Sequence, residues 1–327
     1  MKNLELNLGK PCNNRCVFCA TGERSRGDRG WMDVAEAEQA LDRGRREGAA
    51  AVGFVGGEPT LYRDLPRLVR CARDLGYSRV SLCTNGRRLA RPALLESLLT
   101  AGLTRVALSI HSHRADLEDR ITRRPGGFAE KLAAIDLLTK ARDAGRLPDG
   151  LSLNTVLHAQ NLAALPRLAG FFGRLGMPDI RFNFIRPEVS PDQARRWVPT
   201  FTRTTPRVMD LVVHNETVLG MRLTLADFPL CRLPWEVLAN PRLRHRYLGE
   251  PQDLETKVAM HRPAVRGGTK RFDWQDQRVG LLKQHVPACD ACAARPRCEG
   301  IWRGYVDLYG DREFADGPTV ARALIAG

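Results

Sequence analysis

Short apolar runs alternate with longer amphipathic segments from Leu4 to about Asp227 of this 327-residue chain. We predict strands near Leu4–Leu8, Ala51–Val55, Arg79–Cys83, Thr104–Ile110, Leu151–Leu157 and Ile180–Ile185. Helices are expected between them, at about Asp33–Glu47, Asp64–Leu75, Pro92–Ala101, Ala129–Ala144, Leu162–Leu175 and Pro206–Leu219. Repeated strand–helix units are typical of an α/β fold with a parallel sheet, in which side chains after the carboxyl ends of the strands gather at one edge.

Three cysteines follow the first predicted strand with the spacing Cys-x3-Cys-x2-Cys, at Cys12, Cys16 and Cys19. Iron–sulfur clusters are normally held by four thiolates, so three thiolates leave one iron of a cubane free to bind a small chelating ligand. Spacing alone leaves a zinc site or three unrelated thiols as alternatives.

A second motif, Gly56-Gly57-Glu58-Pro59, directly follows the second predicted strand. Two glycines let the backbone approach a ligand closely, and the carboxylate can accept charge-assisted hydrogen bonds. In isolation this string could be an ordinary turn. One strand after the three cysteines, and with Phe18 just before the third of them, it resembles the signature of the radical S-adenosylmethionine (radical SAM) superfamily.

The resemblance implies an α/β fold, a partial (β/α)6 TIM barrel, and a cofactor pair that carries out the difficult chemistry. In this family the open iron of a 4Fe–4S cluster chelates S-adenosylmethionine, whose reductive cleavage releases a 5′-deoxyadenosyl radical that abstracts hydrogen. The Gly-Gly-Glu-Pro motif binds the ammonium of the cofactor. Residues at further strand ends are expected to contact its ribose, carboxylate or adenine, although helix caps and turns use the same residue types: Thr84, Asn85, Ser109, His111 and Asn154.

A second group of cysteines, Cys289-x2-Cys292-x5-Cys298 with Cys231 upstream, could close all four corners of another 4Fe–4S cluster. The run is similar to the centre of the SPASM motif of radical SAM maturases, which carries more cysteines; position 302 here is Trp. We therefore expect a reduced, SPASM/Twitch-like domain with one auxiliary cluster, covered by the aromatic segment 300–310. A structural zinc on the same four thiolates is the main alternative.

The strand–helix rhythm fails after about Pro229, which predicts a radical SAM core over residues 1–228 and a small auxiliary-cluster domain with a C-terminal tail over 229–327. No apolar run approaches the ~20 residues that a membrane span needs, and no signal peptide is apparent. Nine cysteines without an export signal indicate metal or redox chemistry in a reducing compartment, with the cytoplasm as the default.

An excess of basic residues, 51 Lys and Arg against 37 Asp and Glu, gives a net charge of +14 and favours an anionic partner. Most of the excess is scattered arginine, which could also reflect coding bias. We expect an oxidoreductase that acts on a peptide or natural product, phosphorylated and nucleotide-linked compounds included, and that receives electrons from a reductant such as flavodoxin or ferredoxin.

Because the first strand begins at Leu4, no N-terminal leader-binding domain is expected, and a ribosomal-peptide substrate would need a separate recognition protein. Two alternatives remain open. An RNA-modifying enzyme is disfavoured because no RNA-binding module is visible. A non-catalytic Fe–S or zinc module would not need the Gly-Gly-Glu-Pro motif.

Overall fold

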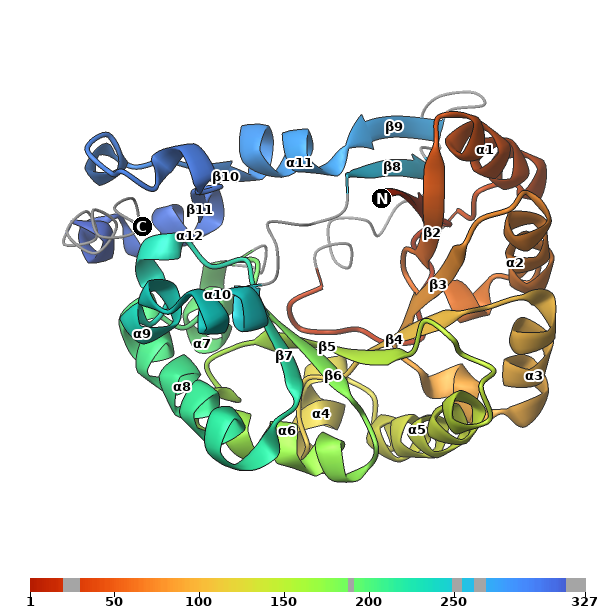
Figure 1. The fold of residues 1–327 in the computed structure, drawn as a ribbon, viewed down its shortest axis with the longest axis horizontal. Helices are drawn as coiled ribbons and strands as arrows, with labels where there is room; N and C mark the ends of the chain where they lie inside the picture. Colours follow the sequence, from red (N-terminus) through yellow and green to blue (C-terminus); the bar gives the residue numbers. More distant parts are fainter. Residues whose placement is uncertain (20–29, 188–190, 249–254, 262–268, 316–327) are drawn as a thin grey trace.

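The computed structural model describes residues 1–19, 30–187, 191–248, 255–261 and 269–315. Its main element is a nine-stranded sheet in the order β7-β6-β5-β4-β3-β2-β1-β8-β9. The strands curve into an open arc with helices along the outside (Figure 1). All neighbours pair in parallel except β8 and β9. The strands are β1 (Lys2–Asn7), β2 (Ala49–Val55), β3 (Arg79–Thr84), β4 (Arg105–Ser109), β5 (Leu151–Leu157), β6 (Asp179–Phe184), β7 (Arg222–Ala226), β8 (Thr256–His261) and β9 (Thr269–Asp273).

Eight α-helices precede β7 in the described part of the chain: α1 (Val34–Arg46), α2 (Leu65–Asp74), α3 (Pro92–Ala101), α4 (Ala115–Thr122), α5 (Gly127–Asp143), α6 (Leu165–Arg174), α7 (Pro191–Trp197) and α8 (Phe201–His214). The predicted α/β fold with a mostly parallel sheet is confirmed, and all six predicted strands exist with ends shifted by at most two residues. The strands β7, β8 and β9 were not anticipated. Neither were α4 and α7, because their short sequences read as charged loops.

The strands separate an apolar outer face from a more polar inner face. Leu82 and Leu108 are almost fully buried beneath the helices, whereas their neighbours Cys83 and Ser109 are only half-buried. Strands of a doubly covered parallel sheet are usually apolar on both faces. The alternation here indicates that the inner face of the arc is less completely covered than the outer face, and Ser109 pairs in register with Asn154 of β5 on that inner face.

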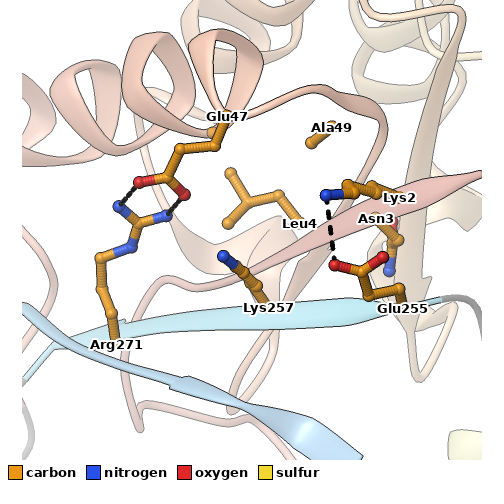
Figure 2. A pocket seen from close by; sticks show the side chains of 9 residues that line it. Lys2, Asn3, Leu4, Glu47, Ala49, Glu255, Lys257 and Arg271 are labelled. Atoms are coloured by element: carbon orange, nitrogen blue, oxygen red, sulfur yellow. Dashed lines mark hydrogen bonds and ion pairs between the residues drawn. The ribbon is translucent and has the colours of Figure 1, made fainter.

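The hairpin of β8 and β9 extends the sheet beyond β1 (Figure 2). Arg271 of β9 makes a bidentate ion pair with Glu47, with N–O distances of 3.0 and 2.7 Å. Lys2 lies 3.4 Å from Glu255 on the other side of a cavity of about 10 Å³, which holds one water at most. Residues on both sides of position 229 therefore share one sheet. The division into a radical SAM core over 1–228 and an auxiliary-cluster domain with a C-terminal tail over 229–327 stays a prediction.

The chain after β7 is built from short elements: α9 (Trp235–Ala239), α10 (Pro241–Leu248), α11 (Trp274–Gln277), α12 (Arg303–Tyr309), and β10 (Lys283–Gln284) paired with β11 (Ile301–Trp302). A second apolar core joins its last part to the barrel, where Tyr305 packs on Phe201 and accepts a hydrogen bond from the Phe201 N–H at 3.1 Å. Tyr309 donates to the Val198 carbonyl at 2.7 Å. No helix in the described ranges is long and apolar enough to cross a membrane.

Candidate active site

The loop that carries the first three cysteines leaves β1 and packs directly on the segment that follows β2. The Gly57 N–H donates to the Gly9 carbonyl at 2.7 Å, and the Glu58 N–H donates to the Pro11 carbonyl at 2.8 Å. Gly56 has a φ of +135°, and a Cβ on Gly57 would lie 2.2 Å from the Pro11 oxygen. The two glycines are therefore required by contact between two backbones, because no side chain fits between these loops.

The Glu58 carboxylate is 1% exposed and bonded within the protein. Its Oε1 accepts from the Thr60 N–H and hydroxyl at 3.1 and 2.6 Å and from the Thr84 hydroxyl at 2.5 Å. Its Oε2 accepts from the Asn85 N–H at 2.8 Å. A carboxylate offers about four acceptor sites, so Glu58 joins the ends of β2 and β3 and keeps acceptor capacity only on Oε2.

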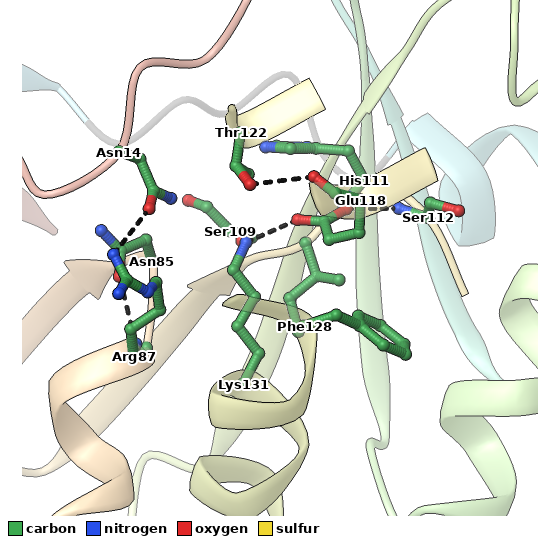
Figure 3. A network of polar contacts seen from close by, with 12 residues as sticks. Asn14, Asn85, Arg87, Ser109, His111, Ser112, Glu118, Thr122, Phe128 and Lys131 are labelled. Carbon is green, nitrogen blue, oxygen red and sulfur yellow. Dashed lines mark hydrogen bonds and ion pairs between the residues drawn. The ribbon is translucent and has the colours of Figure 1, made fainter. Parts of the chain in front are cut away.

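Two residues after β3 hold the start of the cysteine loop (Figure 3). The Asn85 side chain donates to Asn13 Oδ1 at 2.7 Å, and its Nδ2 lies 4.0 Å from the Cys12 sulfur. Arg87, only 7% exposed, donates to the Asn13 carbonyl at 2.9 Å and to Asn14 Oδ1 at 3.1 Å. Thr84 and Asn85 were predicted to contact the cofactor; that remains a prediction, while their visible partners belong to the protein.

The other end of the loop lies on the last turn of α4. The Arg15 and Val17 N–H groups donate to the Thr122 and Ile121 carbonyls, both at 2.9 Å. These carbonyls belong to the end of a helix, where intrahelical donors are missing. The cysteine loop thus supplies the partners that the end of α4 lacks.

The three thiols lie within electrostatic reach of one another. Burial is the main reason that the pKa of Cys16 is raised to about 12; the charge of Lys131 opposes this rise, and Cys19 and Cys12 contribute to it. Burial also raises the pKa of Cys12, and Cys19 contributes to that rise. The three thiols lie on one loop and influence one another's pKa, which agrees with the prediction that they hold three corners of one cluster.

On the inner face of the sheet, the structure brings Ser109 and Asn154 together with Cys83. Asn154 Nδ2 lies 3.7 Å from the Cys83 sulfur, and Ser109 also hydrogen-bonds to this thiol. Burial raises the pKa of Cys83 to about 11, so the thiol is protonated at neutral pH. These three polar side chains come from β3, β4 and β5 and lie on the inner face of the arc.

Two histidines near the end of β4, His111 and His113, contact different parts of the protein. His111 is buried, its Nδ1 accepts from the Val156 N–H at 3.2 Å, and its ring meets Phe18 edge-on at 5.0 Å. Burial holds the pKa of His111 well below its usual range, so the ring is neutral. His113 turns towards Phe171 of α6, at 6.0 Å between ring centres. His111 therefore supports the cysteine loop through Phe18, whatever it contributes to cofactor binding.

The second cysteine group also converges. Burial raises the pKa of Cys231 to about 12, and the charges of Cys298, Cys289 and Cys292 each add to the rise. Next to it, Arg232 has a buried Nε and Nη2 with no hydrogen-bond acceptor in the described part of the chain. Within that same part, no three His, Cys, Asp or Glu side chains are close enough to bind a single metal ion. The four thiols therefore lie near one another but do not form a preformed site for a single metal ion in the described part of the chain.

A cavity of about 850 Å³ lies between the β7 edge of the sheet, α10, α11 and the second cysteine group. Its volume is in the range of small-molecule sites. Cys298 and Trp274 line it, together with Arg244 of α10 and Arg297. Arg244 donates to the Leu238 carbonyl at 3.0 Å. The acidic lining residues have partners: Asp273 caps α11, Glu255 faces Lys2, and Asp227 and Glu299 face Arg278 and Lys283.

Sequence reasoning missed three charged residues that surround the cysteine loop: Arg87, Glu118 and Lys131, which are 7%, 0% and 1% exposed. Arg87 lies two residues after Asn85, which was predicted to contact the cofactor, so the sequence did offer a signal for it. Glu118 and Lys131 lie on helices among other charged residues, and their sequence carries no sign that they are buried.

Comparison with known proteins gives a consistent result. The Radical SAM superfamily sequence model matches residues 6–171. A Saccharolobus solfataricus protein named "Probable GTP 3′,8-cyclase" is 31% identical over 187 residues, 57% of this chain and 58% of the relative. The "PqqA peptide cyclase" of Rhodopseudomonas palustris is 35% identical over 162 residues, 49% of this chain and 41% of that protein. The chain thus spans about half the length of these curated relatives.

Among solved structures, Streptococcus suis SuiB bound to the precursor peptide SuiA matches with a TM-score of 0.61 at 16% identity, over 98% of this chain and 75% of SuiB. This likeness concerns the fold. The family match covers half of the chain and includes both the cysteine loop and the motif after β2. The chain belongs to the radical SAM superfamily of enzymes.

Proposed function

We propose that this enzyme binds its 4Fe–4S cluster through Cys12, Cys16 and Cys19 and uses S-adenosylmethionine to abstract hydrogen from an anionic peptide or natural-product substrate. When bound, the cluster and S-adenosylmethionine supply a 5′-deoxyadenosyl radical by reductive cleavage. The observation that carries the proposal is the position of the cysteine loop: its backbone at Gly9 and Pro11 accepts hydrogen bonds from Gly57 and Glu58 at the carboxyl ends of β1 and β2, and its thiols influence one another's pKa.

The residues of the inner face would bind and orient the cofactor. Gly56, Gly57, Glu58 and Pro59 form the wall beside the cysteine loop, and the free acceptor capacity of Glu58 Oε2 suits an ammonium group. Ser109 and Asn154 offer a hydroxyl and an amide to ribose or carboxylate oxygens. Thr84, Asn85 and His111 act closer to the loop, because their hydrogen bonds fix the groups around it.

For the second group we propose a SPASM/Twitch-like auxiliary 4Fe–4S cluster on Cys231, Cys289, Cys292 and Cys298. The effect of Cys298, Cys289 and Cys292 on the pKa of Cys231 supports one cluster bound by all four thiols. The two Arg232 nitrogens without acceptors support it as well, since buried donors without acceptors are costly and cluster sulfurs accept hydrogen bonds.

The substrate class rests on the cavity beside Cys298. SuiB bound to a precursor peptide and the PqqA peptide cyclase favour a peptide, whereas the relative named for GTP favours a nucleotide. A nucleotide or an acidic peptide would be anionic, and neither Arg244 nor Arg297 has a carboxylate partner in the described ranges. A peptide substrate could bring a separate leader-recognition protein. The reductant would be flavodoxin or ferredoxin in the cytoplasm.

The test uses anaerobically reconstituted full-length protein with dithionite or flavodoxin as reductant. S-adenosylmethionine should be converted to 5′-deoxyadenosine and methionine, slowly without substrate. Separate deuterated pools of peptides, nucleotides with nucleotide sugars, and RNA should transfer label into 5′-deoxyadenosine only where they contain the substrate. The matched control, with Cys12, Cys16 and Cys19 replaced by Ala, should form no 5′-deoxyadenosine; formation at the wild-type rate would refute the proposed ligands.

A further inference from the structure

Close to the cysteine loop lies a buried ion pair that neither the family motifs nor the proposed ligands include. Lys131 Nζ of α5 lies 2.5 Å from Glu118 Oε1 of α4, and the two side chains are 1% and 0% exposed. Lys131 also donates to the Ser109 carbonyl at 2.8 Å. Glu118 Oε2 accepts from the His111 and Ser112 N–H groups, both at 2.8 Å. The pair thus joins the end of β4 to both helices that follow it (Figure 3).

The same pair is one step from the loop. Thr122 donates its hydroxyl to the Glu118 carbonyl at 2.9 Å, and the Thr122 carbonyl accepts from the Arg15 N–H. On the other side of Cys16, the Val17 N–H donates to the Ile121 carbonyl. The backbone on both sides of Cys16 is therefore bonded to the helix turn that Glu118 anchors.

We propose that Glu118 and Lys131 form a positioning pair for the first cluster site, which fixes Cys16 on α4 and places two fixed, opposite charges beneath it. The proposal rests on Cys12, Cys16 and Cys19 being the cluster ligands. Charges in a buried site are weakly screened. Removing one member of the pair should therefore alter the electrostatic potential at the cluster with a sign set by the charge that remains.

The alternative is a purely structural pair. Breaking a buried ion pair destabilises a protein whatever its surroundings, so loss of stability alone would not distinguish the two roles. The reduction potential of a cluster responds to nearby charge, and a negative charge left behind disfavours the added electron. We therefore expect opposite shifts: Lys131→Met lowers the midpoint potential of the first cluster, and Glu118→Gln raises it.

The experiment measures this potential by EPR-monitored titration at one pH, in protein whose auxiliary cysteines are replaced so that only the first cluster is present. The double variant Glu118→Gln/Lys131→Met should lie between the single variants. Lys140→Met is the matched control, because Lys140 is on the same helix in an exposed ion pair with Asp136 and should leave the potential unchanged.

A second readout needs no cluster. In the apoprotein, alkylation of Cys16 followed by mass spectrometry should be faster in either single variant than in the wild type, with Lys140→Met as before. Shifts of the same sign in both single variants, or unchanged potential and alkylation, would overturn the positioning role. Absence of a cluster from the wild-type cysteine loop would instead overturn the proposed ligands, so the two failures are distinguishable.

Discussion

The two cysteine groups are held in different ways. The first lies on a loop bonded on one side to residues after β2 and β3 and on the other to α4, all parts of the main sheet and its helices. In the second group, Cys231 and Cys289 lie on three-residue helical turns, Leu230–Arg232 and Pro287–Cys289, and Cys298 follows a third, Arg295–Arg297, beside two-residue strands. Short elements contribute few hydrogen bonds of their own. The first group is therefore shaped by the fold, whereas the second depends more on what it binds.

Residues 278–315, called the second region below, are attached to the main sheet by ion pairs and by an aromatic contact. Lys283, 1% exposed, lies 2.7 Å from Glu299 and 3.5 Å from Asp227 of the barrel, with its Nζ 4.6 Å from the ring centre of Trp302. Arg278 faces the same two carboxylates. These charges join the end of β7 to the segment that follows Cys298. In the second region these ion pairs have the role that backbone hydrogen bonds have at the first cysteine loop.

The largest expected effect comes from removing each set of thiols. Replacing Cys12, Cys16 and Cys19 by Ala should leave about four irons per chain on the second group and abolish cleavage of S-adenosylmethionine. Replacing Cys231, Cys289, Cys292 and Cys298 should leave slow cleavage but make the region after residue 274 sensitive to protease. Elemental analysis and limited proteolysis measure the two outcomes.

Zinc in place of iron in the first of these variants would refute an auxiliary iron–sulfur cluster. An unchanged digestion pattern in the second variant would refute the dependence of that region on its ligand. The exposed pair Lys140 and Asp136 offers a control substitution that should alter neither result.

Glu58→Ala should have the next largest effect. It removes the acceptor of the Asn85 and Thr60 N–H groups, and each buried unsatisfied donor costs about 1–3 kcal/mol of unfolding free energy. Loss of a charge-assisted contact to the ammonium of S-adenosylmethionine should add about a hundredfold loss of affinity.

Chemical denaturation and equilibrium binding separate these effects of Glu58. Glu96→Ala is the control, because it also removes a paired carboxylate, but from an exposed ion pair with Arg146 that makes no contact with the cysteine loop or the Gly-Gly-Glu-Pro motif. Unchanged affinity in a destabilised Glu58→Ala protein would limit the residue to its structural contacts.

The sequence predicts the first region better than the second for a physical reason. A strand period of two and a spacing such as Cys-x3-Cys-x2-Cys are local patterns, so the six strands and the cysteine loop are readable from the chain. Burial is not local: Glu118 and Lys131 look like ordinary helix charges until α4 and α5 pack together. The pairing of β8 with β1 joins residues about 250 positions apart and leaves no trace in either segment.

Lys283→Met should destabilise the attachment of the second region by about 3 kcal/mol, because it leaves Glu299 and Asp227 with fewer buried partners. The barrel should keep its stability, since none of the contacts of the first cysteine loop involves Lys283. Hydrogen exchange measures both regions in one experiment. Faster exchange confined to residues 278–315 would agree with the comparison, whereas uniform loss of protection would contradict independent attachment.

The smallest effect concerns the cavity next to Cys298. Arg297 is exposed at its wall and Arg244 lies on α10, so neither holds the fold together as Lys283 does. If an anionic substrate binds between them, Arg297→Gln should raise KM severalfold, because an exposed charge pair contributes about 0.2–1 kcal/mol. Slow cleavage of S-adenosylmethionine without substrate should not change.

High salt should weaken substrate binding to the wild type as the screening length falls to about 3 Å at 1 M, and should weaken binding to the Arg297→Gln variant less. Arg295→Gln, two residues away and paired with Asp290, is the matched control. Equal KM values for all three proteins at every salt concentration would show that the basic excess plays no part in substrate binding.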